Sequence, residues 1–137
     1  MNRLNEKIQE IEKYLQELSE IIPTNFEEYK HEFKIRAACE RYFERIIESV
    51  TDLAFLVIKE YNLKIPEEDK QSFDVLNEGK IISDRLKEKL REAKGMRNIL
   101  AHEYGKVDDE IVFDSIKEEL ILDVEEFIKQ IKKFIKK

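Results

Sequence analysis

Three side chains close together near the C-terminal part of the chain could bind a phosphate and transfer a proton. The segment Arg97 to Tyr104 includes His102, so a guanidinium, an imidazole and a phenol lie within about two helical turns. When residues 83–104 are placed on a helix at about 100° per residue, Arg97 falls on the apolar stripe. An arginine removed from water needs a partner, because an unpaired buried charge is costly. We therefore expect Arg97 to bind an anion.

These groups are suited to cleavage of a phosphodiester by an internal nucleophile. A neutral His102 would take the proton of a ribose 2′-hydroxyl, and Arg97 would hold the non-bridging oxygens. The reaction requires no metal, and its need for a 2′-hydroxyl predicts RNA rather than DNA as the substrate. On a straight helix Arg97 and His102 point about 140° apart. The helix could fray near Gly105, Arg97 could reach around it, or two copies of the motif could meet in a two-fold homodimer.

Each of the three residues also has a structural interpretation. His102 could cap a helix, and Tyr104 could belong to the core. Arg97 could pair with a carboxylate of the second predicted helix, and the candidates there are Glu44, Glu48 and Asp52.

A cluster of basic residues precedes the motif on the same predicted helix. It is the best local candidate for a nucleic-acid contact, and it comprises Arg85, Lys87, Lys89, Arg91, Lys94 and Arg97. Lys87, Arg91 and Lys94 fall on the flank where charges are normally solvated. The cluster is therefore equally typical of a solvated helix face that carries i,i+4 ion pairs.

The composition indicates one all-helical domain that spans residues 1–137. The chain has three Gly, two Pro and 41% charged residues, and its apolar residues are spaced by three and four. A net charge of −6 weighs against a protein that coats nucleic acid in general, since such binding depends on neutralising phosphates. Any contact with RNA should be local.

The remaining motifs predict a cytoplasmic protein without a metal or other cofactor. The single Cys39 cannot form an internal disulfide and should be a small buried hydrophobe. His31 should lie on the surface. No signal peptide, membrane span, Gly-rich phosphate loop or His and Cys spacing typical of a metal site is present in the sequence.

Capping residues and apolar periodicity predict an up-and-down bundle of about five helices. Residues 2–20 form the first helix, and Thr24 with Glu27 forms a capping box that opens a long second helix over residues 25–61. An apolar surplus at 54–58 could be a dimer interface. A short helix over 68–78 should end at Gly79 in a left-handed conformation. Ser83 should cap the motif helix, and Asp108 should cap the last helix, 109–135.

The motif and its surroundings resemble a known family. The pattern Arg97-x4-His102-x-Tyr104 resembles the R-x4-H-x-Y signature of HEPN domains, and of the HepT toxins in particular. Residues 35–58 resemble the long second helix of the family, 73–82 its short helix and turn, and 94–98 the approach to its motif. The resemblance extends over residues 4–130.

The resemblance implies a HEPN-like homodimer that acts as a metal-independent endoribonuclease, the toxin of a type VII HepT/MNT toxin–antitoxin pair. Arg97 and His102 would be catalytic, and Asn98, Glu48 and Asp52 would support them. The antitoxin would be an MNT-type nucleotidyltransferase that transfers AMP to Tyr104. This chain lacks the Gly-Ser and paired-aspartate pattern of such an enzyme, so the transferase would be a separate partner.

Two other functions are compatible with the same residues. A HEPN-like bundle could bind a nucleotide, or dock a nucleotidyltransferase, without cleaving RNA. A purely structural helical dimer could use Arg97 in a buried ion pair, and its removal would then destabilise the fold strongly.

Overall fold

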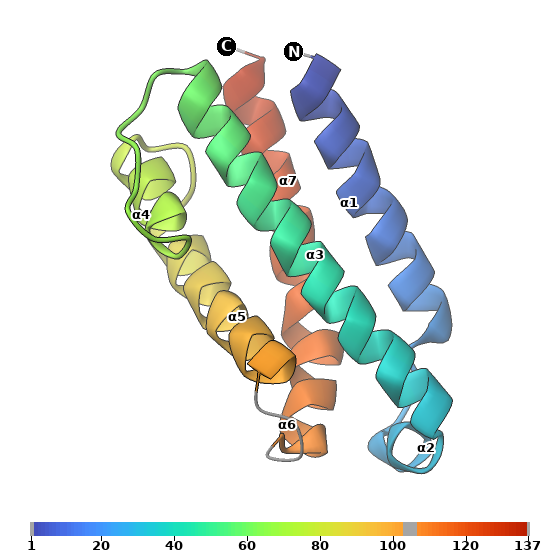
Figure 1. The fold of residues 1–137 in the computed structure, drawn as a ribbon. Coiled ribbons are helices and arrows are strands. Elements are labelled where there is room, and N and C mark those ends of the chain that lie inside the picture. The colour runs from blue at the N-terminus through green and yellow to red at the C-terminus, as the bar shows by residue number, and fades with distance from the viewer. Residues whose placement is uncertain (1, 103–106, 137) are drawn as a thin grey trace.

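The computed structural model describes residues 2–102 and 107–136, and every regular element within them is helical (Figure 1). The elements are α1 (Asn2–Ile21), α2 (Phe26–His31), α3 (Phe33–Glu60), α4 (Gln71–Glu78), α5 (Asp84–His102), α6 (Asp109–Asp114), the π-helical segment η1 (Ser115–Leu120) and α7 (Ile121–Ile135). The predicted all-α class and helical bundle are confirmed.

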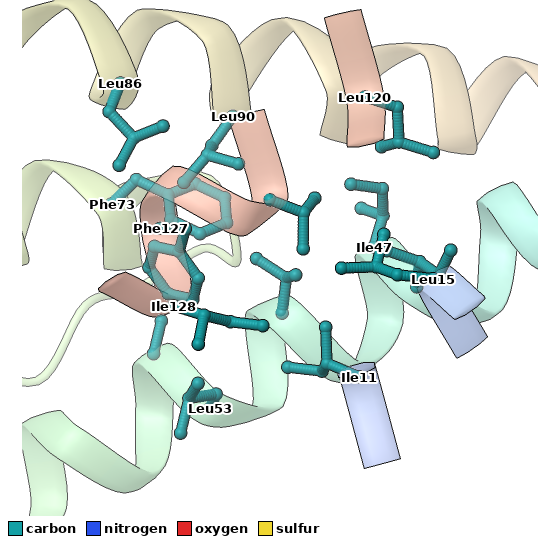
Figure 2. Close-up of a cluster of buried hydrophobic side chains, with 14 of the residues drawn as sticks. Ile11, Leu15, Ile47, Leu53, Phe73, Leu86, Leu90, Leu120, Phe127 and Ile128 are labelled. Carbon is teal, nitrogen blue, oxygen red and sulfur yellow. The ribbon is translucent and has the colours of Figure 1, made fainter. Parts of the chain in front are cut away.

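Helix α3 is the centre of the bundle. It packs against α1, α2, α4 and α5, and α7 closes the bundle by packing against α1 and α5 (Figure 1). The core between them joins Ile11 of α1, Leu53 of α3, Phe73 of α4, Leu90 of α5 and Phe127 of α7 (Figure 2). Each such side chain stabilises the fold by about 1.5–3 kcal/mol when fully buried. Because α5 contributes to this core, its direction is fixed by the whole bundle.

The long second helix predicted for residues 25–61 is divided in two. Its cap is Asn25 rather than Thr24, since the Asn25 Oδ1 accepts a hydrogen bond from the Glu28 backbone N–H at 3.0 Å. The helix is interrupted at Glu32, whose φ of −104° and ψ of 83° are not helical. The break turns α2 toward α6, where the buried ring of Tyr29 packs against Phe113 with centroids 5.1 Å apart. Burial of Tyr29 therefore outweighs continuation of the helix.

The turns after α3 and α4 place their left-handed residues at Asn62 and Lys80. Gly79 has a φ of −80°, so the prediction that it adopts a left-handed conformation is wrong. The next residue, Lys80, has a φ of 60°, and the backbone N–H of Ile81 then donates to the carbonyl of Leu76 at 2.9 Å. This bond closes the end of α4 and determines which residue must take positive φ.

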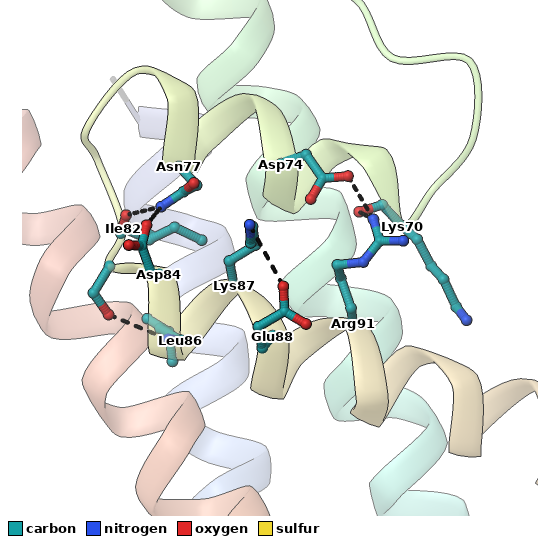
Figure 3. A network of polar contacts seen from close by, with 10 residues as sticks. Lys70, Asp74, Asn77, Ile82, Asp84, Leu86, Lys87, Glu88 and Arg91 are labelled. Atoms are coloured by element: carbon teal, nitrogen blue, oxygen red, sulfur yellow. Dashed lines mark hydrogen bonds and ion pairs between the residues drawn. The ribbon is translucent and has the colours of Figure 1, made fainter.

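The start of α5 is held by several polar contacts (Figure 3). The predicted cap Ser83 is confirmed, because its Oγ accepts from the Leu86 backbone N–H at 3.2 Å. The Asn77 amide donates to the Ile82 carbonyl at 3.1 Å and to Asp84 at 2.8 Å. These contacts tie α5 to α4 and fix the helix at the end opposite to the motif.

The last predicted helix follows its expected course with one change of geometry. The Asp108 carboxylate caps it by accepting from the backbone N–H groups of Glu110 and Ile111 at 3.0 and 3.3 Å. Helical structure then continues to Ile135, but residues 115–120 are π-helical. None of the helices in the described ranges, 2–102 and 107–136, is long and apolar enough to cross a membrane.

Candidate active site

The motif lies on the last two turns of α5. The helix is intact through His102, so Arg97 and His102 diverge by about 140° as on a straight helix. Asn98 and His102 are exposed and share one face at i,i+4, whereas Arg97 points toward α3 with its side chain 21% exposed. Tyr104 and Gly105 lie outside the described residues.

Arg97 has an acid partner within its own chain. Its Nη2 donates to Oε2 of Glu48 on α3 at 3.0 Å, and its Nη1 donates to Oδ1 of Asn98 at 3.5 Å. Its buried Nε has no acceptor among residues 2–102 and 107–136. The Glu48 side chain is 51% exposed, so the pair stands at an open edge between α3 and α5. Because Nε is buried, a phosphate at this edge could accept only from the second hydrogens of Nη1 and Nη2.

The other carboxylates considered for Arg97 lie elsewhere on α3. Asp52 is one helical turn beyond Glu48, and its Oδ2 is 3.7 Å from Nζ of Lys7 on α1. Glu44 pairs with Arg41 at 4.0 Å on the same helix. The structure thus brings Glu48 and Asn98 to Arg97, and it places Asp52 toward α1.

The basic cluster that precedes the motif is neutralised by acids. The ion pairs are Arg85 with Asp123 at 3.2 Å, Lys87 with Glu88 at 3.5 Å, Lys89 with Glu119 at 2.6 Å, Arg91 with Asp74, Lys94 with Asp69 at 3.4 Å, and Arg97 with Glu48 at 3.0 Å. The interpretation of a solvated face with i,i+4 pairs is wrong, because most partners come from other elements. Lys94 is only 5% exposed, since α4 and the residues before it cover this flank of α5.

Lys70 is a further residue near the motif that the sequence did not indicate. A Cβ added to Gly95 would lie 3.3 Å from its Nζ, so the ammonium of Lys70 rests on α5 at Gly95. The available signal was Gly95 itself. A glycine inside an exposed helix costs about 1 kcal/mol relative to alanine and needs a packing or functional reason.

The predictions for Cys39 and His31 are confirmed. Cys39 is fully buried, and burial raises the pKa of its thiol to about 11, so it is a small buried hydrophobe. The His31 side chain is largely exposed, and its Nε2 is 3.3 Å from Glu27. Within the described parts of the chain, no three His, Cys, Asp or Glu side chains are grouped so that they could hold a metal ion.

The fold and the motif together define a HEPN-type helical bundle. Residues 11–131 match the profile of the Ribonuclease HepT-like family. The chain therefore belongs to the Ribonuclease HepT-like family, and the resemblance noted from the motif is confirmed.

This chain is similar over most of its length to two relatives and to a solved structure. It is 31% identical over 116 residues to a candidate RNase of Archaeoglobus fulgidus, an alignment that covers 85% of this chain and 81% of the relative. It is 29% identical over 105 residues to the mRNA nuclease HepT of Shewanella oneidensis, with 77% and 78% covered. A solved structure of the tri-AMPylated Shewanella oneidensis HEPN toxin in complex with MNT antitoxin superposes with a TM-score of 0.87 at 25% identity, covering 95% and 96% of the two chains.

Proposed function

We propose that this protein is an RNA endonuclease, the toxin of a HepT/MNT toxin–antitoxin pair, in which His102 and Arg97 act on the phosphodiester. The observation that carries the proposal is the last turn of α5. There an exposed imidazole lies about one and a half turns from a partly buried guanidinium, which donates to Glu48 and Asn98 at the edge between α3 and α5. Membership of a family with an mRNA nuclease among the relatives supports it.

The reaction proceeds without a metal ion. His102 accepts the proton of the ribose 2′-hydroxyl, and the 2′-oxygen attacks phosphorus. The bond from phosphorus to the 5′-oxygen of the next nucleotide breaks, and that oxygen takes up a proton. The products are a 2′,3′-cyclic phosphate and a 5′-hydroxyl. Arg97 stabilises the negative charge that develops on the non-bridging oxygens.

The divergence of the two side chains favours a homodimer. On an intact helix, Arg97 and His102 of one chain point about 140° apart and do not converge easily on one phosphate. A two-fold axis beside the end of α5 would place Arg97 of one protomer opposite His102 of its partner. We place this dimer in the cytoplasm, where its RNA substrate occurs.

Cleavage of a defined RNA in EDTA tests the mechanism. The wild-type protein should cut the RNA and leave cyclic phosphate ends, and it should not cut the same sequence with 2′-deoxyribose at the cleaved position. His102→Ala should be inactive. His31→Ala is the matched control, since His31 is exposed and is the only other histidine. Equal cleavage by the two variants, or cleavage of the deoxy substrate, would contradict the proposal.

We also propose that a separate MNT-type nucleotidyltransferase silences the toxin by transferring AMP to Tyr104. The support is the relative described as a tri-AMPylated HEPN toxin in complex with MNT antitoxin. Coexpression with the transferase should raise the intact mass by whole AMP units and abolish RNA cleavage. Tyr104→Phe should gain no mass and stay active in its presence. A mass gain that Tyr104→Phe does not prevent would move the modified position elsewhere.

One observation favours a second candidate, a binding module that docks the transferase without cutting RNA. Arg97 already has an anion, Glu48, at 3.0 Å. In that case the purified protein should bind the transferase or a nucleotide, Arg97→Ala should weaken the binding, and neither protein should cleave RNA at any concentration.

A further inference from the structure

One face of α5 leads away from His102 toward Lys70. Residues 91, 95, 98 and 102 are spaced by four, three and four, so they share this face. From the motif outward the face presents the exposed His102, the exposed Asn98 and then Gly95. Gly95 has no side chain, and the ammonium of Lys70 occupies the space above it.

The backbone of Lys70 is fixed in this position by its neighbours. Nη1 of Arg91 donates to the Lys70 carbonyl at 3.3 Å, and the same guanidinium is paired with Asp74 on α4 (Figure 3). The Lys70 side chain extends past Arg91 (Figure 3) and brings its Nζ to 3.3 Å and its Cε to 3.8 Å from the position of a Cβ on Gly95. Although Lys70 precedes α4, its side chain makes no capping hydrogen bond.

The charge of Lys70 is not neutralised as its neighbours' charges are. Asp69 pairs with Lys94 and Asp74 pairs with Arg91, whereas the other nearby acids, Glu67 and Glu68, are exposed before α4. No carboxylate lies within 4.0 Å of the Lys70 Nζ among residues 2–102 and 107–136. Among the described residues, Lys70 is therefore a partly exposed cation without an ion-pair partner, and its ammonium lies over the α5 face that carries His102.

We propose that Lys70 is a positioning residue that binds a phosphate of a single-stranded RNA lying along α5, with Gly95 providing the space for its side chain and Asn98 lying between Lys70 and His102. The proposal rests on the proposed function, because it assigns RNA as the ligand of this face. Gly95 and His102 are seven residues apart, or about 10 Å along the helix axis. That span corresponds to roughly two or three nucleotides from the cleaved bond.

Binding of a single-stranded oligoribonucleotide to the His102→Ala protein tests this contact while the RNA remains intact. Lys70→Gln should weaken binding by about 5- to 10-fold at low salt and reduce the dependence of affinity on salt by about one counterion. Lys129→Gln is the matched control. Lys129 is an exposed lysine of α7 outside this face, and its substitution should change affinity less than about twofold.

Gly95→Gln is a second, independent variant. Its side chain would fill the space above α5 that Lys70 occupies, so it should weaken RNA binding about as much as Lys70→Gln does. The two changes together should weaken binding no more than either alone, because both remove the same contact. The thermal midpoint of Gly95→Gln should rise, since glutamine favours a helix more than glycine does. A loss of RNA binding with gain of stability separates positioning from a structural role.

Cleavage kinetics complete the test in the protein with His102 present. Lys70→Gln should raise KM for a 12-nucleotide RNA with kcat unchanged, and it should not alter cleavage of a dinucleotide, which is too short to reach Lys70. Unchanged RNA affinity and salt dependence in Lys70→Gln, or no RNA binding at all, would overturn the proposal. RNA binding that depends on Lys70 in a protein that never cuts RNA would support it and overturn the nuclease function instead.

Discussion

The first and last parts of α5 carry cationic side chains in different surroundings. From Arg85 to Lys94 the cations are paired with acids, and most of these acids come from α7, η1, α4 and the residues before α4. From Arg97 to His102 the only acid in an ion pair, among residues 2–102 and 107–136, is Glu48, which is half exposed. The two parts would be hard to distinguish by charge in the sequence. They differ in the acids that other elements contribute. These acids bind the cations of the first part and attach the helix to the bundle, whereas the last part can still receive a ligand.

The division also explains how the last turn is positioned. The paired cations and the core residues of the first part connect α5 to its neighbouring elements, whereas in the last turns Asn98 and His102 are exposed and Leu100 is buried. A rigid support with an open end is what precise placement of a reacting group requires.

The largest difference between the two parts should be in stability. Leu90 of the first part is 1% exposed and lies in the core, so Leu90→Ala should lower the free energy of unfolding by about 2–5 kcal/mol. Ile99 of the last part is 47% exposed, and Ile99→Ala should cost less than about 1 kcal/mol. Urea denaturation of both variants measures the difference. Equal losses would mean that the last turn is as much a part of the core as the first part.

A smaller effect concerns the ion pair of the buried Lys94. Asp69→Asn removes the carboxylate and leaves the ammonium of Lys94 buried without it, which should cost about 1–2 kcal/mol because Asp69 itself is solvated. Lys94→Met removes the buried charge and leaves Asp69 in water, so stability should stay within about 1 kcal/mol of wild type or rise. Thermal denaturation compares the two. A greater loss in Lys94→Met than in Asp69→Asn would show that the charge of Lys94 stabilises the fold in another way.

The smallest effect is expected on RNA cleavage when a cation in the first part of α5 is substituted. Arg85→Gln changes a cation that is paired with Asp123 and lies far from the motif along α5. Cleavage per folded molecule should remain within about twofold of wild type, since this guanidinium is engaged by the buried Asp123 and is not free for phosphate. Initial cleavage rates at two salt concentrations measure this. A tenfold loss would assign the first part of α5 to the substrate-binding surface.

Periodicity and capping residues predicted most of the fold. The stripes of apolar residues correctly gave the helical class, and Ser83 and Asp108 correctly marked where two helices begin. The errors arose where a tertiary contact decides between two acceptable local conformations. The break at Glu32 depends on packing of Tyr29 against Phe113, which is 84 residues away in sequence. The left-handed residue after α4 is set by the bond from Ile81 to Leu76.

The candidate site was predictable in part for the same reason. The spacing of Arg97 and His102 identified the motif, and the structure bears out the alternative in which Arg97 pairs with a carboxylate of the second predicted helix. Sequence could not choose among Glu44, Glu48 and Asp52, because one turn of α3 decides which carboxylate faces α5. Lys70 and Gly95 are 25 residues apart in sequence, and no local periodicity indicates that they are in contact.

Arg97 either stabilises the reacting phosphate of the RNA or only forms a structural ion pair between α5 and α3. A comparison of Arg97→Ala with Glu48→Gln decides between these roles. Both changes break the same 3.0 Å ion pair. For both proteins, RNA cleavage in EDTA and the free energy of unfolding should be measured together. We expect Arg97→Ala to lose about 10²–10³ in cleavage rate with a stability change below about 1 kcal/mol, and Glu48→Gln to cleave at least as fast as wild type. Equal and large losses of stability, with cleavage per folded molecule unchanged in both, would contradict a catalytic Arg97.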